Sequence, residues 1–189
     1  MNRPAGEAFP EGDTRPAGDT RPAGEARPTI ERAEIDGIPV FWLPDGRRPM
    51  AALQFRVGRS DEAFAQMGIT HLTEHLAFFR AGRRPYPVNG FVDNVRTVFH
   101  VAGSPHEITE FLHGIVAALQ DLPLDRVTDE ARILRTEALR QTPSLWDQLA
   151  WYRYGAVGHG AVGLPEFGLN GIAPDAVAAW SRDWFTAGN

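Results

Sequence analysis

Two histidines and a glutamate in the segment ITHLTEHLAFF have the spacing to share a metal ion. His71 and His75 are four positions apart, so on a helix they project from the same face, one turn from each other. A zinc ion held by two imidazoles needs a third protein ligand and an open position, where a bound water has its pKa lowered to about 7. Glu74, beside the two histidines, is then the candidate general base that takes a proton from this water as it attacks a peptide carbonyl and passes it to the leaving amine.

A later segment, EARILRTEALR, supplies candidate carboxylate ligands. Glu130 and Glu137 are seven positions apart and therefore lie on one helical face, with apolar residues between them. Two carboxylates on an apolar stripe are costly to bury unless a positive charge compensates them, as a zinc ion does. We predict Glu137 as the third zinc ligand and Glu130 as a group that orients a ligand or shares its hydrogen bonds. The alternative stays open that this is a solvated helix face, whose glutamates pair with nearby arginines.

Turn-forming residues and the alternation of apolar and polar side chains predict the strands that must position these residues. Residues 29–43 favour a β-hairpin, because Asp36-Gly37 readily adopts the positive backbone angles of a tight turn. Alternating apolar and polar residues predict a third strand over 51–58 and a fourth running without a break from Phe91 to Val101.

Helical periods follow the strands. They predict helices over 66–80, 126–141, 142–154 and 174–185. A further helix is predicted to begin at the capping box of Ser104 and Glu107, and residues 155–171 are predicted to form a glycine-rich loop. In the first of these helices, Leu72, Leu76 and Phe79 form the stripe expected to face the core. Strands followed by a run of helices predict an α+β fold, an antiparallel or mixed sheet with helices packed on one face.

Composition excludes several classes of protein. The 189 residues suffice for one domain, contain no cysteine and carry a net charge of -5, so disulfides and thiolate metal sites are excluded and nothing indicates nucleic-acid binding. Residues 1–28 repeat DTRPAG and lack large apolar side chains, which predicts a disordered tail ahead of a folded unit over 29–189. No apolar run suits a membrane span or a secretory signal, so a cytoplasmic location is expected.

The stretch GRSDEAFAQMGITHLTEHLAFF resembles the metal-binding segment of the pitrilysin/insulinase family, which includes the mitochondrial processing peptidases. In that family an acidic pair and a glycine precede an inverted His-x-x-Glu-His helix, and a later helix carries two glutamates seven apart, of which the second binds zinc. The resemblance extends from the hairpin near Thr29 to the end of the chain. It implies a zinc metalloendopeptidase that acts on extended peptides.

The resemblance also implies where substrate and partner bind. The strand that pairs with the substrate backbone corresponds to NGFVDNVRTVF, which makes Asn89, Gly90 and Thr97 candidate substrate-binding residues. The family pattern continues beyond Asn189 into a further strand and a second, similarly folded domain, so a second domain or subunit is the expected partner and the sheet is expected to lack its last strand. Two alternatives remain open: a non-catalytic scaffolding or peptide-binding half, and another divalent ion in place of zinc.

Overall fold

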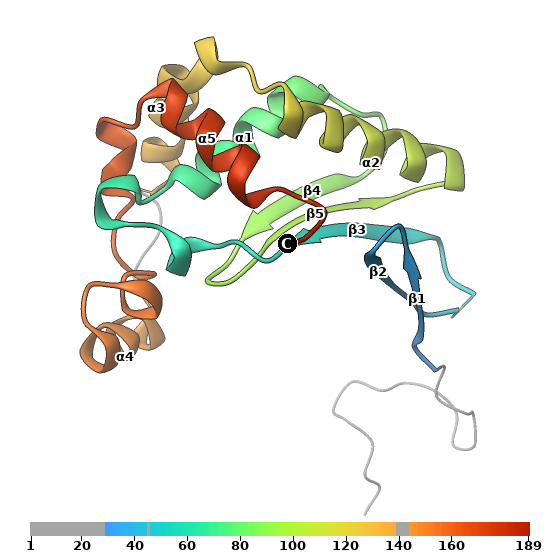
Figure 1. Cartoon of the computed structure of the whole chain (residues 1–189), viewed down its shortest axis with the longest axis horizontal. Coiled ribbons are helices and arrows are strands. Elements are labelled where there is room, and N and C mark those ends of the chain that lie inside the picture. The colour runs from blue at the N-terminus through green and yellow to red at the C-terminus, as the bar shows by residue number, and fades with distance from the viewer. Residues whose placement is uncertain (1–28, 45, 139–143) are drawn as a thin grey trace, which may run out of the picture.

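The computed structural model describes residues 29–44, 46–138 and 144–189. Within these residues the chain is a mixed α+β structure with two small antiparallel sheets (Figure 1). The predicted disordered tail, residues 1–28, lies outside the described residues. So do residues 139–143, which include the expected end of the helix predicted over 126–141.

The first sheet is the predicted hairpin. Strands β1 (Glu31–Ile35) and β2 (Ile38–Trp42) pair in antiparallel register, Ile35 opposite Ile38. The two turn residues both have positive φ, 52° at Asp36 and 81° at Gly37, which is the geometry of a two-residue hairpin turn. Asp-Gly was therefore sufficient to predict this element.

The second sheet is antiparallel with the strand order β3-β5-β4, formed by β3 (Met50–Phe55), β4 (Val88–Val92) and β5 (Thr97–Ala102). Strand β5 is central and mostly buried. Strand β4 pairs only with β5 among the described residues, so its other edge is open.

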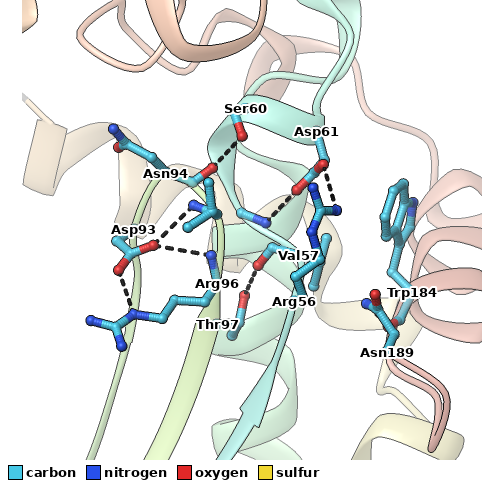
Figure 2. A network of polar contacts seen from close by, with 12 residues as sticks. Arg56, Val57, Ser60, Asp61, Asp93, Asn94, Arg96, Thr97, Trp184 and Asn189 are labelled. Atoms are coloured by element: carbon cyan, nitrogen blue, oxygen red, sulfur yellow. Dashed lines mark hydrogen bonds and ion pairs between the residues drawn. The ribbon is translucent and has the colours of Figure 1, made fainter.

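The prediction of one continuous strand from Phe91 to Val101 is wrong, because the chain reverses at 93–96. The Asp93 carboxylate accepts hydrogen bonds from the backbone N–H groups of Val95 and Arg96, at 2.9 and 3.0 Å, and so stabilises a turn (Figure 2). Val95 is exposed at this turn. Its apolar side chain extended the alternating pattern across the reversal, so periodicity alone missed the turn.

Five α-helices lie within the described residues. They are α1 (Ile69–Ala81), α2 (Pro105–Gln120), α3 (Val127–Ala138), α4 (Leu145–Tyr154) and α5 (Pro174–Trp184). Short 3₁₀ turns connect the elements: η1 (Arg59–Asp61), η2 (Phe64–Gln66), η3 (Leu124–Arg126), η4 (Gly158–Gly160) and η5 (Phe167–Asn170). Helices α1, α2 and α5 lie over one face of the β3-β5-β4 sheet, whereas α4 stands apart from it (Figure 1). The predicted α+β class, with helices on one face of a sheet, is confirmed.

The core lies between the sheet and the helices, and α1 contributes its centre. Leu72 and Leu76 are fully buried, as predicted from their spacing. The prediction for Phe79 is wrong, because the residue is 51% exposed and the Cζ atom of Arg126 lies over its ring, 4.7 Å from the ring centroid. Phe78 packs against the core in its place, with its ring 5.5 Å from that of Phe99. Helix α1 is thus fixed on one side and leaves its histidine face toward α3.

None of the helices in the described part of the chain is long and apolar enough to cross a bilayer. The cytoplasmic location stays a prediction.

Candidate active site

The buried carboxylate of Glu62 caps the start of helix α1. The two carboxylate oxygens of Glu62 accept hydrogen bonds from the backbone N–H groups of Gly68, at 2.8 Å, and Thr70, at 2.9 Å. Gly68 has a φ of 95°, a left-handed conformation that suits glycine. This cap places the first residue of the helix at Ile69, three residues later than predicted, and fixes the turn that carries His71.

The two imidazoles lie edge to face on one side of α1. The ring centroids of His71 and His75 are 5.0 Å apart, with an angle of 89° between the planes. One ligand atom from each of His71, Glu74 and His75 can be chosen so that all lie within 4.8 Å of one another. The spacing of the three residues along the helix therefore produces a compact group of possible metal ligands, which does not include the predicted third ligand Glu137.

Helix α3 brings both predicted carboxylates to His75. The Oε2 atom of Glu130 lies 3.5 Å from His75 Nδ1, and the Oε2 atom of Glu137 lies 3.9 Å from His75 Nε2. Two ligands of one zinc ion stand roughly 3–4 Å apart, because each lies about 2 Å from the metal. Glu137 thus lies on the side of the ring where a shared cation would fit, and Glu130 on the opposite nitrogen.

The two glutamates of α3 differ in their exposure. The Glu130 side chain is 7% exposed, and Arg126 Nη2 lies 3.4 Å from its Oε1 atom. The Glu137 side chain is 46% exposed. The solvated-face alternative thus fails for Glu130, which is a buried carboxylate paired with an arginine and a histidine, while Glu137 remains partly open to solvent.

Glu74 is buried between α1 and the edge strand β4. Its side chain is 7% exposed, and its Oε2 atom lies 4.0 Å from His75 Nε2. Gly90 of β4 faces it so closely that a Cβ added there would lie 2.5 Å from Glu74 Oε1. The absence of a side chain at position 90 therefore makes the room that this carboxylate occupies.

Burial shifts the pKa values of Glu74 and His75. It raises the pKa of Glu74 to about 7, an effect that the charge of His71 opposes and that of Glu137 reinforces. Burial and the charge of His71 lower the pKa of His75, although Glu137 and Glu130 act in the opposite direction. A neutral imidazole at His75 is the form that binds a metal, and a carboxyl that titrates near neutrality suits proton transfer.

Glu166 also contacts the site, and no pattern in the sequence predicted it. Its Oε1 and Oε2 atoms lie 3.0 and 3.3 Å from Nδ1 of His71. The Nη2 atom of Arg59 lies 3.1 Å from the same Oε1 atom. Glu166 stands in the predicted glycine-rich loop over 155–171, 95 positions from His71, and no local spacing pattern links the two.

The predicted substrate-binding residues divide between the edge and the interior of the sheet. Asn89 is exposed on β4, and Gly90 faces Glu74 on the same strand. Thr97 is fully buried on the central strand, where its hydroxyl donates to the carbonyl of Val57 at 2.9 Å (Figure 2). The Thr97 side chain therefore binds the segment that precedes η1 and does not lie at the open edge of β4.

A cavity of about 250 Å³ opens beside His71 and is lined in part by Arg59, Asp93, Asp147 and Glu166. A larger cavity of about 850 Å³ lies between β3, α2 and α5, and none of the predicted site residues lines it. Among the predicted site residues, His71 alone lines the smaller cavity, beside Arg59 and Glu166.

Comparison with known proteins gives likeness in structure and none in sequence. No protein-family model and no curated protein matches the chain. A mutant of the ferredoxin protease FusC, solved in complex with Arabidopsis ferredoxin, is similar with a TM-score of 0.66 and 14% identity, over 86% of this chain. A putative M16-like peptidase from Alicyclobacillus acidocaldarius is similar with a TM-score of 0.61 and 16% identity, over 87% of this chain. The periplasmic protease PqqL from Escherichia coli is similar with a TM-score of 0.61 and 15% identity, over 84% of this chain.

These structures are longer than this chain. It spans 21% of the FusC chain, 45% of the Alicyclobacillus chain and 21% of the PqqL chain. At such low identity the likeness establishes the fold alone. The chain therefore has the fold of part of a pitrilysin-like, M16-like peptidase.

Proposed function

We propose that this chain carries the metal site and the proton-transfer group of a zinc metalloendopeptidase. The observation that carries the proposal is the arrangement around His75, whose Nε2 atom lies 3.9 Å from Glu137 Oε2 and 4.0 Å from Glu74 Oε2, with His71 in the same compact group. Two imidazoles and a carboxylate are the donor set of many catalytic zinc sites. His71, His75 and Glu137 are the proposed ligands.

The proposed roles follow from burial and chemistry. A zinc ion, when bound, would supply the Lewis acidity that lowers the pKa of water and polarises a carbonyl. Glu74 would take the proton of the attacking water and deliver it to the leaving amine. Its burial against Gly90 shields the carboxyl from solvent, and in the metal-free chain burial raises the pKa of Glu74 to about 7. Glu130 would orient His75 through Nδ1.

The proposed substrate is an extended peptide that lies along β4. Among the described residues β4 pairs only with β5, so its outer edge offers unpaired backbone groups next to Glu74. Asn89 and Gly90 would lie beside the added strand. Thr97 is not part of this proposal, because its hydroxyl is bonded inside the protein.

A second domain or subunit would complete the enzyme. The proposal rests on the length of the similar structures, of which this chain spans 21% to 45%. Cleavage is therefore tested with and without a candidate partner half. If zinc binding is intact and cleavage appears only on addition of that half, the need for a partner is supported.

The deciding experiment measures zinc content and cleavage of an unstructured peptide in the wild type and in Glu74→Gln. The variant should bind zinc and cut at least about a hundredfold more slowly, because general-base catalysis contributes about 10²–10⁴-fold. Equal rates at full zinc content would reject the base role. A protein that never binds zinc, and whose peptide binding survives His71→Ala, would be a scaffolding half instead. Measuring manganese and cobalt in parallel tests the identity of the metal.

A further inference from the structure

Each of the two histidines has a carboxylate on its Nδ1 atom. Glu130 lies 3.5 Å from Nδ1 of His75, and Glu166 lies 3.0 Å from Nδ1 of His71. Each carboxylate is in turn paired with an arginine, Glu130 with Arg126 at 3.4 Å and Glu166 with Arg59 at 3.1 Å. The arrangement of arginine, carboxylate and imidazole thus occurs twice around one candidate metal site.

The two arrangements are built differently. Arg126 and Glu130 are one helical turn apart, so local geometry brings them together. Arg59 and Glu166 come from η1 and from the loop before η5, which are distant in the sequence. A contact between residues so far apart depends on how both segments are anchored.

The anchoring of Arg59 comes from the β4–β5 turn. The N–H of Arg59 donates to the carbonyl of Asp93 at 3.0 Å, and the N–H of Ser60 donates to the carbonyl of Asn94 at 2.9 Å. The Ser60 hydroxyl also donates to the Asn94 carbonyl, at 2.5 Å (Figure 2). A Cβ on Gly58 would lie 2.4 Å from the Asp93 carbonyl oxygen, so only glycine permits this approach.

The anchoring of Glu166 comes from close packing against the start of α1. A Cβ on Gly68 would lie 2.8 Å from the Cβ of Glu166 and from Cγ of Leu169. A Cβ on Gly168 would lie 2.7 Å from the backbone N of Met67. Two glycines therefore allow the 166–169 segment to approach the first turn of α1, where His71 stands.

The exposure and charge of the three side chains agree with a fixed hydrogen-bonded unit. The side chains of Glu166, His71 and Arg59 are 10%, 17% and 22% exposed. A carboxylate at this depth is costly unless hydrogen bonds and opposite charge compensate it.

We propose that Glu166, held by Arg59, is a positioning residue that accepts the Nδ1 proton of neutral His71 and so selects the tautomer whose Nε2 atom is unprotonated and free to bind a cation. The effect of Glu166 on zinc affinity rests on the proposed function, because it presupposes that His71 binds zinc. The tautomer and ring orientation of His71 in the metal-free protein are a property of the chain by itself. The two can therefore be tested separately.

The first test is the tautomer of His71 in metal-free, ¹⁵N-histidine-labelled protein at mildly alkaline pH, where neutral imidazoles are compared by long-range ¹H–¹⁵N correlation. The wild type and Glu34→Gln, which alters an exposed carboxylate of β1, should both show the Nδ1–H form. Glu166→Ala should shift His71 toward the Nε2–H form common in water, with His75 unchanged. Glu166→Gln, whose amide oxygen still accepts a hydrogen bond, should restore the Nδ1–H form in part.

The second test is the dissociation constant of zinc, measured by competition with a chromophoric chelator. Glu166→Ala should weaken zinc binding about 10–100-fold, as is usual for loss of a carboxylate behind a histidine ligand, and Glu166→Gln should weaken it less. Arg59→Gln should give an intermediate loss, because Glu166 is retained without its ion pair. Circular dichroism and thermal unfolding identify any variant that fails to fold. If Glu166→Ala does not fold, Glu166→Gln is compared with the wild type instead.

The outcomes separate the two proposals. A wild type that binds no zinc overturns the proposed function, while the tautomer measurement still tests the role of Glu166. A folded Glu166→Ala variant with wild-type His71 tautomer and zinc affinity overturns the inference.

Discussion

The Oε1 atom of Glu74 lies 2.5 Å from the point that a Cβ would occupy at Gly90. The same Cβ would lie 2.6 Å from the Cε2 atom of Phe78, which packs against the core. The backbone of the edge strand and the candidate general base are therefore in direct contact. A peptide that pairs with β4 would run past this carboxylate.

Gly90→Ala should displace Glu74 and disturb the ring of Phe78. We expect the free energy of unfolding to fall by about 1–3 kcal/mol, as is usual for overpacking. Peptide cleavage should fall about tenfold or more, because a small misplacement of a catalytic group is costly. Gly171→Ala is the matched control, since nothing lies within 4 Å of its Cβ position. Unchanged stability and cleavage in Gly90→Ala would refute the contact.

In the metal-free protein, the titration of Glu74 should lower the free energy of unfolding as pH rises from about 4.5 to 7. Its pKa is raised from 4.5 to about 7 by burial, so over this window the folded state binds more protons than the unfolded state, and the free energy of unfolding falls with increasing pH. Glu74→Gln removes this titration. Above pH 7 the variant should be more stable than the wild type by up to about 3 kcal/mol.

Urea unfolding of both proteins across this pH window, with chelator present, measures the effect. Taking the difference between wild type and variant cancels the contribution of groups that do not interact with Glu74, whereas His71, whose charge acts on Glu74, contributes to that difference. Parallel stability curves for the two proteins would show that Glu74 is not the titrating group.

Glu137→Gln and Glu130→Gln should weaken zinc binding to different extents. Loss of a ligand should weaken binding by more than about a hundredfold, whereas loss of the carboxylate behind His75 should weaken it about 10–100-fold. Glu110→Gln, at a half-exposed position on α2, is the control. Chelator competition gives the three constants. A larger loss from Glu74→Gln than from Glu137→Gln would instead make Glu74 the ligand.

Glu62→Ala should destabilise the start of α1. The substitution leaves the N–H groups of Gly68 and Thr70 without their acceptor in a buried environment, and each such group costs about 1–3 kcal/mol. We expect the free energy of unfolding to fall by about 2 kcal/mol or more. Glu34→Ala, on the exposed face of β1, should change it little. Chemical denaturation of both variants checks this, and equal stabilities would exclude the capping role.

The sequence by itself determined the features that depend on near neighbours along the chain. The four-residue spacing of His71 and His75 placed both rings on one helix face, and Asp36-Gly37 predicted the hairpin turn. The capping box of Ser104 and Glu107 marked the start of α2. In each case a few consecutive residues contain the whole interaction, so a pattern in sequence is sufficient to predict it.

Only the tertiary structure decided that Glu166 meets His71 and that Gly90 meets Glu74. Glu166 reaches His71 because glycines at 68 and 168 let two segments pack closely, and Gly90 reaches Glu74 because β4 lies against α1. The turn at 93–96 was missed because Val95 continued the alternating pattern while the Asp93 carboxylate reversed the chain. Such contacts depend on packing between elements, and periodicity within one element carries no information about them.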